Sequence, residues 1–154
     1  MSISDKQFKT LHKGLNMGGK MGGFTVDAKT GKAAISGVVV ANAKGERQVP
    51  ASVVSAGSIK DYHADNRETF HADPKKHLGG WNPGGGKDVS LDTPRVLTGD
   101  KKIKAKYGDN VAAADAMTSA LDIGIQQKQD AVFRLDDNQT VKTGINADKE
   151  RRNA

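Results

Sequence analysis

The chain has 154 residues, of which 36% are hydrophobic and 5% aromatic, and it contains 18 glycines. This length is typical of one domain, and the low apolar content predicts a lean core. The absence of cysteine excludes disulfides, thiolate metal ligands and cysteine nucleophiles. No apolar run approaches the roughly 20 residues that span a bilayer, and the N-terminus lacks the apolar segment of a secretory signal. We therefore expect a soluble intracellular protein with no membrane partner.

The net charge of +6 comes from two short segments. Residues 1–22 carry four lysines against Asp5, and residues 99–106 carry four against Asp100, a balance of +3 in each. Because a basic excess attracts phosphate-bearing or acidic partners, we predict that both segments contact nucleic acid or an acidic protein surface. Solvated lysines in a loop and a tail are the alternative. The predicted contact residues are Lys6, Lys9, Lys13, Lys101, Lys102, Lys104 and Lys106.

In the first half of the chain, the pattern predicts a helix over residues 4–15. Ser4 is a suitable N-cap, and Phe8, Leu11 and Leu15 recur at spacings of three and four on one face. A glycine-rich joint follows. Three strand-like runs separated by two turns then predict an antiparallel meander. The joint spans residues 16–23, and the runs span 24–27, 33–41 and 46–53.

In the second half, Ser58 is a suitable N-cap for a helix that ends before Pro74. Residues 89–91 resemble a short strand. A run of lysines interrupts the connection between this strand and the next helix. The run predicts an exposed loop with Lys102, Lys104 and Lys106 on one side. The clearest helix starts at Asp109. Its apolar positions are Val111, Ala114, Met117, Leu121 and Ile125.

A closing hairpin is predicted from residues 130–135 and 140–143. Together these elements predict an α+β fold in which a small antiparallel or mixed sheet is packed by two helices, with flexible N- and C-terminal tails. The predicted organisation is a basic N-terminal helix with its glycine-rich joint (1–22), a single α+β domain (23–144) and a polar tail (145–154).

Trp81 is the chain's only tryptophan, and it follows two glycines. One interpretation is that its indole packs flat on the sheet and fills a core short of aromatics. The other is that it stacks on a base or another ligand near Lys75, Lys76 and Lys87, which adds Trp81 to the candidate partner-binding residues.

No arrangement of residues predicts catalysis or a bound metal. His63 and His71 are eight residues apart without a full set of zinc ligands, so helix packing is the simpler role. Asp88 and Asp92 flank a strand, where turn capping and solvation explain both. The glycines at 84–86 lead into a strand rather than a helix, which favours a hairpin connection over a phosphate loop. We therefore predict no cofactor, no metal and no enzymatic activity.

Five segments together resemble a small uncharacterised domain of actinobacterial phages and mobile elements, found alone or within large multidomain phage proteins. They are GFTV at 23–26, HLGGW at 77–81, VSLD at 89–92, Ala116 and QDAVFRL at 129–135. The resemblance covers about residues 23–144 and brings no catalytic residues with it. It implies a protein of a phage or mobile element. Together with the concentrated lysine charge, this predicts a non-enzymatic interaction protein in the host cytoplasm or the virion. The alternative is a capsid-decorating or cementing subunit that contacts other virion subunits or further copies of itself.

Overall fold

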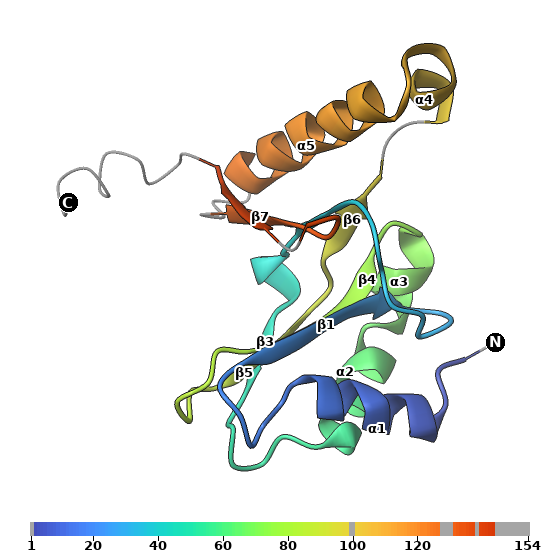
Figure 1. Ribbon diagram of the computed structural model, residues 1–154. Coiled ribbons are helices and arrows are strands. Elements are labelled where there is room, and N and C mark those ends of the chain that lie inside the picture. The colour runs from blue at the N-terminus through green and yellow to red at the C-terminus, as the bar shows by residue number, and fades with distance from the viewer. Residues whose placement is uncertain (1, 99–100, 127–130, 138, 144–154) are drawn as a thin grey trace, which may run out of the picture. The chain divides into compact units, whose positions relative to one another are not determined.

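The computed structural model in Figure 1 describes residues 2–98, 101–126, 131–137 and 139–143. The chain divides into two compact units, of which unit 1 comprises Met1–Ala34 and Asn42–Pro94 and unit 2 comprises Ile35–Ala41 and Arg95–Ala154. Helices and antiparallel strands occur in both units, so the predicted α+β class is confirmed. Each unit has a four-stranded sheet of its own, where the sequence predicts one sheet in all.

Unit 1 is built on an antiparallel sheet in the order β1-β4-β5-β3. Its elements are α1 (Asp5–Gly14), β1 (Gly22–Asp27), η1 (Ala43–Gly45), β3 (Arg47–Val49), α2 (Ala56–Asp65), α3 (Arg67–Ala72), β4 (His77–Asn82) and β5 (Val89–Asp92). Strand β4 pairs with β1 on one side and β5 on the other, so Gly80 lies between Phe24 and Leu91. Position along β4 therefore determines which residues of three strands share a face.

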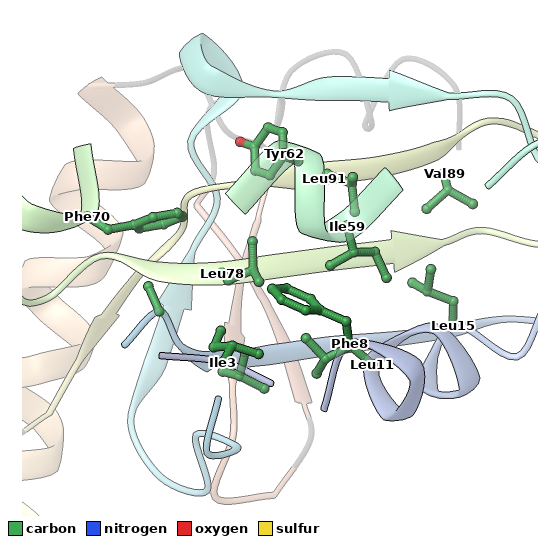
Figure 2. Packing of buried hydrophobic residues seen from close by; sticks show 12 residues of the cluster. Ile3, Phe8, Leu11, Leu15, Ile59, Tyr62, Phe70, Leu78, Val89 and Leu91 are labelled. Carbon is green, nitrogen blue, oxygen red and sulfur yellow. The ribbon is translucent and has the colours of Figure 1, made fainter. Parts of the chain in front are cut away.

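The core of unit 1 lies between one face of this sheet and the helices α1, α2 and α3, as Figure 2 shows. Leu78 and Leu91 are fully buried on the inner face of the sheet, while Phe8 and Leu11 reach them from α1. The apolar stripe predicted for α1 is thus confirmed. Because side chains alternate along a strand, Thr25, Trp81 and Ser90 point to the opposite face of the sheet, called the outer face below.

Local capping explains where the first helices begin. Ser4 accepts a hydrogen bond from the Gln7 backbone N–H at 3.2 Å, and the Gln7 side chain accepts one from the Ser4 N–H at 2.8 Å, so α1 opens with the predicted cap. For α2 the predicted N-cap is wrong: Ser55 occupies that position and Ser58 closes the capping box. Both serines are suitable by type, and only the reciprocal bond between them distinguishes their roles.

The predicted three-stranded meander is wrong as a whole, and only its first turn forms, where Val26 and Ala33 make an isolated antiparallel bridge. Strand β1 pairs with β4, β3 pairs with β5, and residues 38–40 form β2 in the sheet of unit 2. The prediction assumes that strands adjacent in sequence pair with one another. In the fold, β1 pairs with β4 instead. Gly79 and Gly80 of β4 have no side chains, which leaves room for side chains from the neighbouring strands.

Unit 2 has one long helix on an antiparallel sheet in the order β6-β2-β7-β8. Its elements are β2 (Val38–Val40), β6 (Arg95–Leu97), α4 (Lys101–Tyr107), α5 (Asp109–Gln126), β7 (Ala131–Arg134) and β8 (Gln139–Lys142). The predicted closing hairpin is confirmed as β7 and β8. The small core contains Val38, Val40, Leu97, Ala120 and Val132.

Helix α5 is confirmed, but its buried face is rotated from the predicted one. Ala112, Ala116 and Ala120 are buried at a spacing of four residues, whereas Ala114 is exposed and Ile125 is 45% exposed. The small alanine side chains allow close approach of helix and sheet, while Met117 and Leu121 of the predicted face are partly buried against the same core.

The organisation predicted as 1–22, 23–144 and 145–154 stays a prediction. Within the described residues, α1 contributes Phe8 and Leu11 to the same core cluster as the strands of unit 1. The predicted polar tail lies outside the described residues.

We expect Asn82→Ala to destabilise the protein by about 2 kcal/mol. Asn82 is 3% exposed, and its amide donates to the Leu15 carbonyl at 2.8 Å while its oxygen accepts from the Gly84 N–H at 3.0 Å. Both backbone partners would lose a bond. Denaturant unfolding measures the change, with the exposed Thr10→Ala as control, for which we expect less than about 0.5 kcal/mol. Equal stability of the two variants would contradict this role.

Candidate functional site

Three lysines form a basic stripe on α1, defined here as Lys6, Lys9 and Lys13. At about 100° per residue they fall within an arc of about 60°, on the opposite side of the helix from Phe8 and Leu11. All three are exposed. Burial of the apolar stripe therefore fixes the direction of the basic one, and the structure brings these three predicted contact residues together.

The ammonium groups of the basic stripe form no hydrogen bond or ion pair with the residues that the structure describes. The nearest acidic residue on the helix, Asp5, is paired with Lys60 of α2 at 2.9 Å. That contact, chiefly the hydrogen bond, lowers the pKa of the Asp5 carboxyl. The charge of the stripe is therefore available to a partner.

The second group of predicted lysines lies on α4, and the loop expected there is wrong. Lysine and alanine favour a helix, and the segment forms one from Lys101 to Tyr107. On a helix, Lys102 and Lys106 share a side and Lys104 points away, so the predicted alignment of all three does not occur. Lys102, Lys104 and Lys106 are exposed, and the Lys106 Nζ lies 5.2 Å from the Tyr107 ring centroid.

Lys101 begins α4, and the position of its side chain lies outside the described residues. The two groups of lysines belong to different units, α1 to unit 1 and α4 to unit 2. Each is therefore a separate candidate surface.

Trp81 does not fill the core. It is 48% exposed on the outer face of the sheet, whereas the adjacent Gly80 and Asn82 are buried. Its indole lies against Gly23, where an added β-carbon would be 2.9 Å from the Trp81 Cε3. The ring lies on the sheet beside a glycine, as predicted, but on the outer face rather than in the core. Trp81 and the basic stripe lie on opposite sides of this sheet and do not form one surface.

The glycines at 84–86 connect β4 to β5, as the hairpin interpretation predicted. Their φ angles of 83°, 66° and 74° lie in the left-handed region, which explains three consecutive glycines. The loop borders a cavity of about 430 Å³ in unit 1. Met17, Asn82 and Asp88 are among its lining residues, and no sequence pattern indicates it because they come from three separate segments.

His63 packs inside unit 1. Its ring contacts Phe8 edge-on at 5.7 Å and stacks on Phe70 at 5.5 Å, and its Nε2 donates to the Ala28 carbonyl at 2.6 Å. Helix packing accounts for this histidine. Within the described parts of the chain, no cluster of three or more potential ligands could hold a metal ion.

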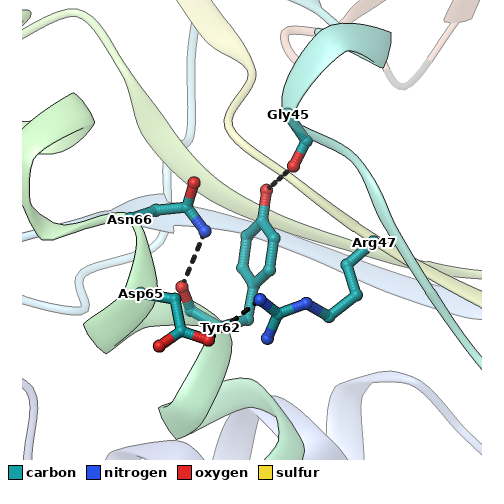
Figure 3. Close-up of polar contacts among 5 residues, drawn as sticks. All are labelled: Gly45, Arg47, Tyr62, Asp65 and Asn66. Carbon is teal, nitrogen blue, oxygen red and sulfur yellow. Dashed lines mark hydrogen bonds and ion pairs between the residues drawn. The ribbon is translucent and has the colours of Figure 1, made fainter.

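Tyr62 links α2 by a hydrogen bond to the segment that leads into β3 (Figure 3). Its hydroxyl donates to the Gly45 carbonyl at 2.6 Å, and burial raises its pKa. The guanidinium of Arg47 lies 5.1 Å from the Tyr62 ring centroid and pairs with Asp65 at 2.9 Å. These contacts hold Arg47 toward the helices and so direct Gln48, the next residue of β3, to the outer face.

The surroundings of Asp92 move the pKa of its carboxyl toward neutral pH. Burial raises its pKa to about 6, even though its Oδ2 accepts the Asn42 N–H at 3.3 Å. The side chain packs directly on Gly79. Asp88, the other half of the carboxylate pair considered from the sequence, is exposed. Asp92 is half-buried and Asp88 is exposed, and the sequence does not reveal which of the two carboxyls is shielded from solvent.

Comparisons of the chain with family models, curated proteins and solved structures find no match. In the described segments, no helix combines the length and the apolar character required to cross a membrane. Function is therefore inferred from the surfaces of the two units.

We expect Asp92→Asn to stabilise the protein at pH 7. The folded state raises the Asp92 pKa from 3.8 to about 6, so between these values it holds a proton that the unfolded chain has released. Stability from this group therefore falls as the pH rises through that range, by at most about 3 kcal/mol. The asparagine side chain does not ionise, so the variant does not lose this stability. The difference in stability between the variant and the native protein should vanish near pH 4.

Denaturant unfolding of both proteins at pH 4 and pH 7 measures the difference. Asp88→Asn is the matched control, because its carboxyl is exposed. A variant at position 92 that is less stable than the native protein at pH 7 would contradict burial as the dominant effect.

Proposed function

We propose that this chain is a non-enzymatic interaction protein that binds a polyanion, with the basic stripe of α1 as the principal contact and the lysines of α4 as a second one. The observation that carries the proposal is the exposed, unpaired stripe on a helix whose other side is anchored in the core. A rigid helix presents its charges without the ordering cost of a mobile tail.

Nucleic acid is the favoured polyanion. Lys6 and Lys13 are seven positions apart, or about 10 Å along the helix. This length equals about three steps of the 3.4 Å rise along the axis of duplex DNA, in which each strand carries one phosphate per step. An acidic protein surface is the alternative partner. As part of the same proposal, the protein belongs to a phage or mobile element and acts in the host cytoplasm or the virion.

A virion structural role is the second candidate, and exposed apolar side chains of unit 2 favour it. Ile35 is 83% exposed and Tyr107 is 60% exposed. Exposed apolar side chains mark a surface that neighbouring subunits cover when they gather in one patch, and the virion proposal requires such a patch on unit 2. Co-purification of the untagged protein with assembled particles would support this role, and its recovery only in particle-free fractions would exclude it.

We expect the triple variant Lys6→Gln, Lys9→Gln, Lys13→Gln to bind a short duplex DNA at least about 10-fold more weakly than the native protein at low salt. The slope of log Kd against log salt should also fall by about 0.9 for each phosphate that the variant no longer neutralises. Fluorescence anisotropy of labelled DNA over a series of salt concentrations measures both effects.

The matched control removes the same charge from exposed lysines elsewhere in unit 1, at Lys29, Lys32 and Lys44. Equal losses of affinity in the two triple variants would show that net charge alone acts, and would contradict a defined site. Binding that does not change with salt would contradict phosphate contact altogether. A stronger response to polyglutamate than to DNA would favour the acidic protein surface.

A further inference from the structure

The outer face of the sheet in unit 1 combines an exposed aromatic ring with fixed polar side chains. Trp81 on β4 is paired with Ser90 on β5, and Ser90 is paired with Gln48 on β3. Neighbouring strands are about 4.8 Å apart, so these three residues form a line that extends about 10 Å from Trp81 to Gln48. This face is distinct from the basic stripe, which lies beyond the opposite side of the sheet.

The indole of Trp81 is seated so that one side of the ring stays open. A β-carbon at Gly23 would lie 2.9 Å from the ring, so the absence of a side chain there lets the indole rest on the β1 backbone. Trp81 as a whole is 48% exposed, and its indole Nε1–H donates to no described residue. A ligand can therefore stack on the ring and accept a hydrogen bond from its edge.

Next to the ring, Gln48 and Ser90 form an oriented polar pair. The Gln48 Nε2 donates to the Ser90 Oγ at 2.9 Å and to the Glu46 carboxylate at 2.8 Å. Both amide hydrogens are thereby used, which leaves the Gln48 Oε1 as an acceptor and the Ser90 hydroxyl as a donor. Their orientation is fixed before any ligand arrives, which lowers the entropic cost of binding.

The acidic excess of this face disfavours the kind of ligand that suits the basic stripe. Its strand residues include Asp27 and Asp92 and contain no lysine or arginine, and Glu46 adjoins them. Lys76 acts on Asp92 and His77 acts on Asp27, so a phosphate would meet three carboxylates against one ammonium group and one imidazole here. A neutral ligand with a flat apolar face and hydroxyl groups along its edge matches both the ring and the polar pair.

We propose that this outer face is a carbohydrate-binding site for a neutral oligosaccharide, with one sugar ring stacked on Trp81 and hydroxyls bound by Gln48 and Ser90. The distance from Trp81 to Gln48 accommodates a second sugar beyond the first. The site is independent of the polyanion surface proposed above, so either can fail alone.

The chain's single tryptophan provides a direct measurement, since all indole emission comes from this site. We expect neutral hexasaccharides of glucose, mannose, galactose or N-acetylglucosamine, titrated to about 10 mM, to shift the emission of Trp81 saturably to shorter wavelength for at least one sugar, with a millimolar Kd. The monosaccharide should bind more weakly because it reaches only the ring.

Variants locate the site. Ligand-observed NMR, which needs no tryptophan, should show about 10-fold weaker binding for Trp81→Ala and a smaller loss for Trp81→Phe and Gln48→Ala. Tyr107→Ala, which removes an exposed aromatic ring from unit 2, is the matched control and should bind as the native protein does. The triple lysine variant of α1 should also retain binding.

Four results would overturn the proposal. They are the absence of a saturable shift with every hexasaccharide, unchanged binding by a folded Trp81→Ala variant, a shift with single-stranded DNA but no sugar, and an emission maximum that moves with protein concentration alone. The third would indicate stacking on a nucleobase, and the fourth would show that a second copy of the chain covers the ring.

Discussion

Unit 1 depends on the register in which strand β4 pairs with its neighbours. This strand is paired on both sides, and side chains are small at the points where its neighbours approach most closely. On the inner face, Phe24 of β1 lies over Gly80, where any β-carbon would meet the ring. On the outer face, Trp81 lies over Gly23 of β1. Each aromatic ring covers a glycine on the neighbouring strand, and these two contacts on opposite faces allow only one register between β1 and β4.

That register also orients α1. Asn82, at the end of β4, is buried and donates to the last turn of the helix at the Leu15 carbonyl. With the end of α1 held there and its apolar stripe against Leu78 and Leu91, the lysines must face away from the sheet. The same strand therefore gives unit 1 two surfaces of different chemistry, one basic on a helix and one aromatic and partly acidic on a sheet.

Features encoded within a few residues could be predicted from the sequence. The α1 cap and its apolar stripe are local, as is the closing hairpin, and all three predictions are confirmed. Pairing between β1 and β4 joins residues fifty to sixty positions apart, and nothing local distinguishes it from a meander. The assignment of residues 38–40 to a second sheet depends on long-range pairing of the same kind.

For the candidate site, the sequence identifies the residues but predicts their structural surroundings only in part. The lysines of α1 are exposed as expected, because their positions oppose the apolar stripe. The charge of the lysine run at α4 suggests a solvated loop, although lysine is also a good helix former. Hydrophobicity alone favours the core for Trp81, and only the register places it outside. Asp92 likewise packs against Gly79 of the neighbouring strand, a contact that no local pattern reveals.

Helix α1 and Trp81 lie on opposite sides of one sheet, and we infer that they meet different partners. Amide NMR spectra of nitrogen-labelled protein, recorded while duplex DNA is added, test this inference residue by residue. We predict shifts along α1 around Lys6, Lys9 and Lys13 and an unmoved indole N–H signal of Trp81. An indole signal that moves together with those of α1 would contradict the inference, because a single ligand would then contact both surfaces.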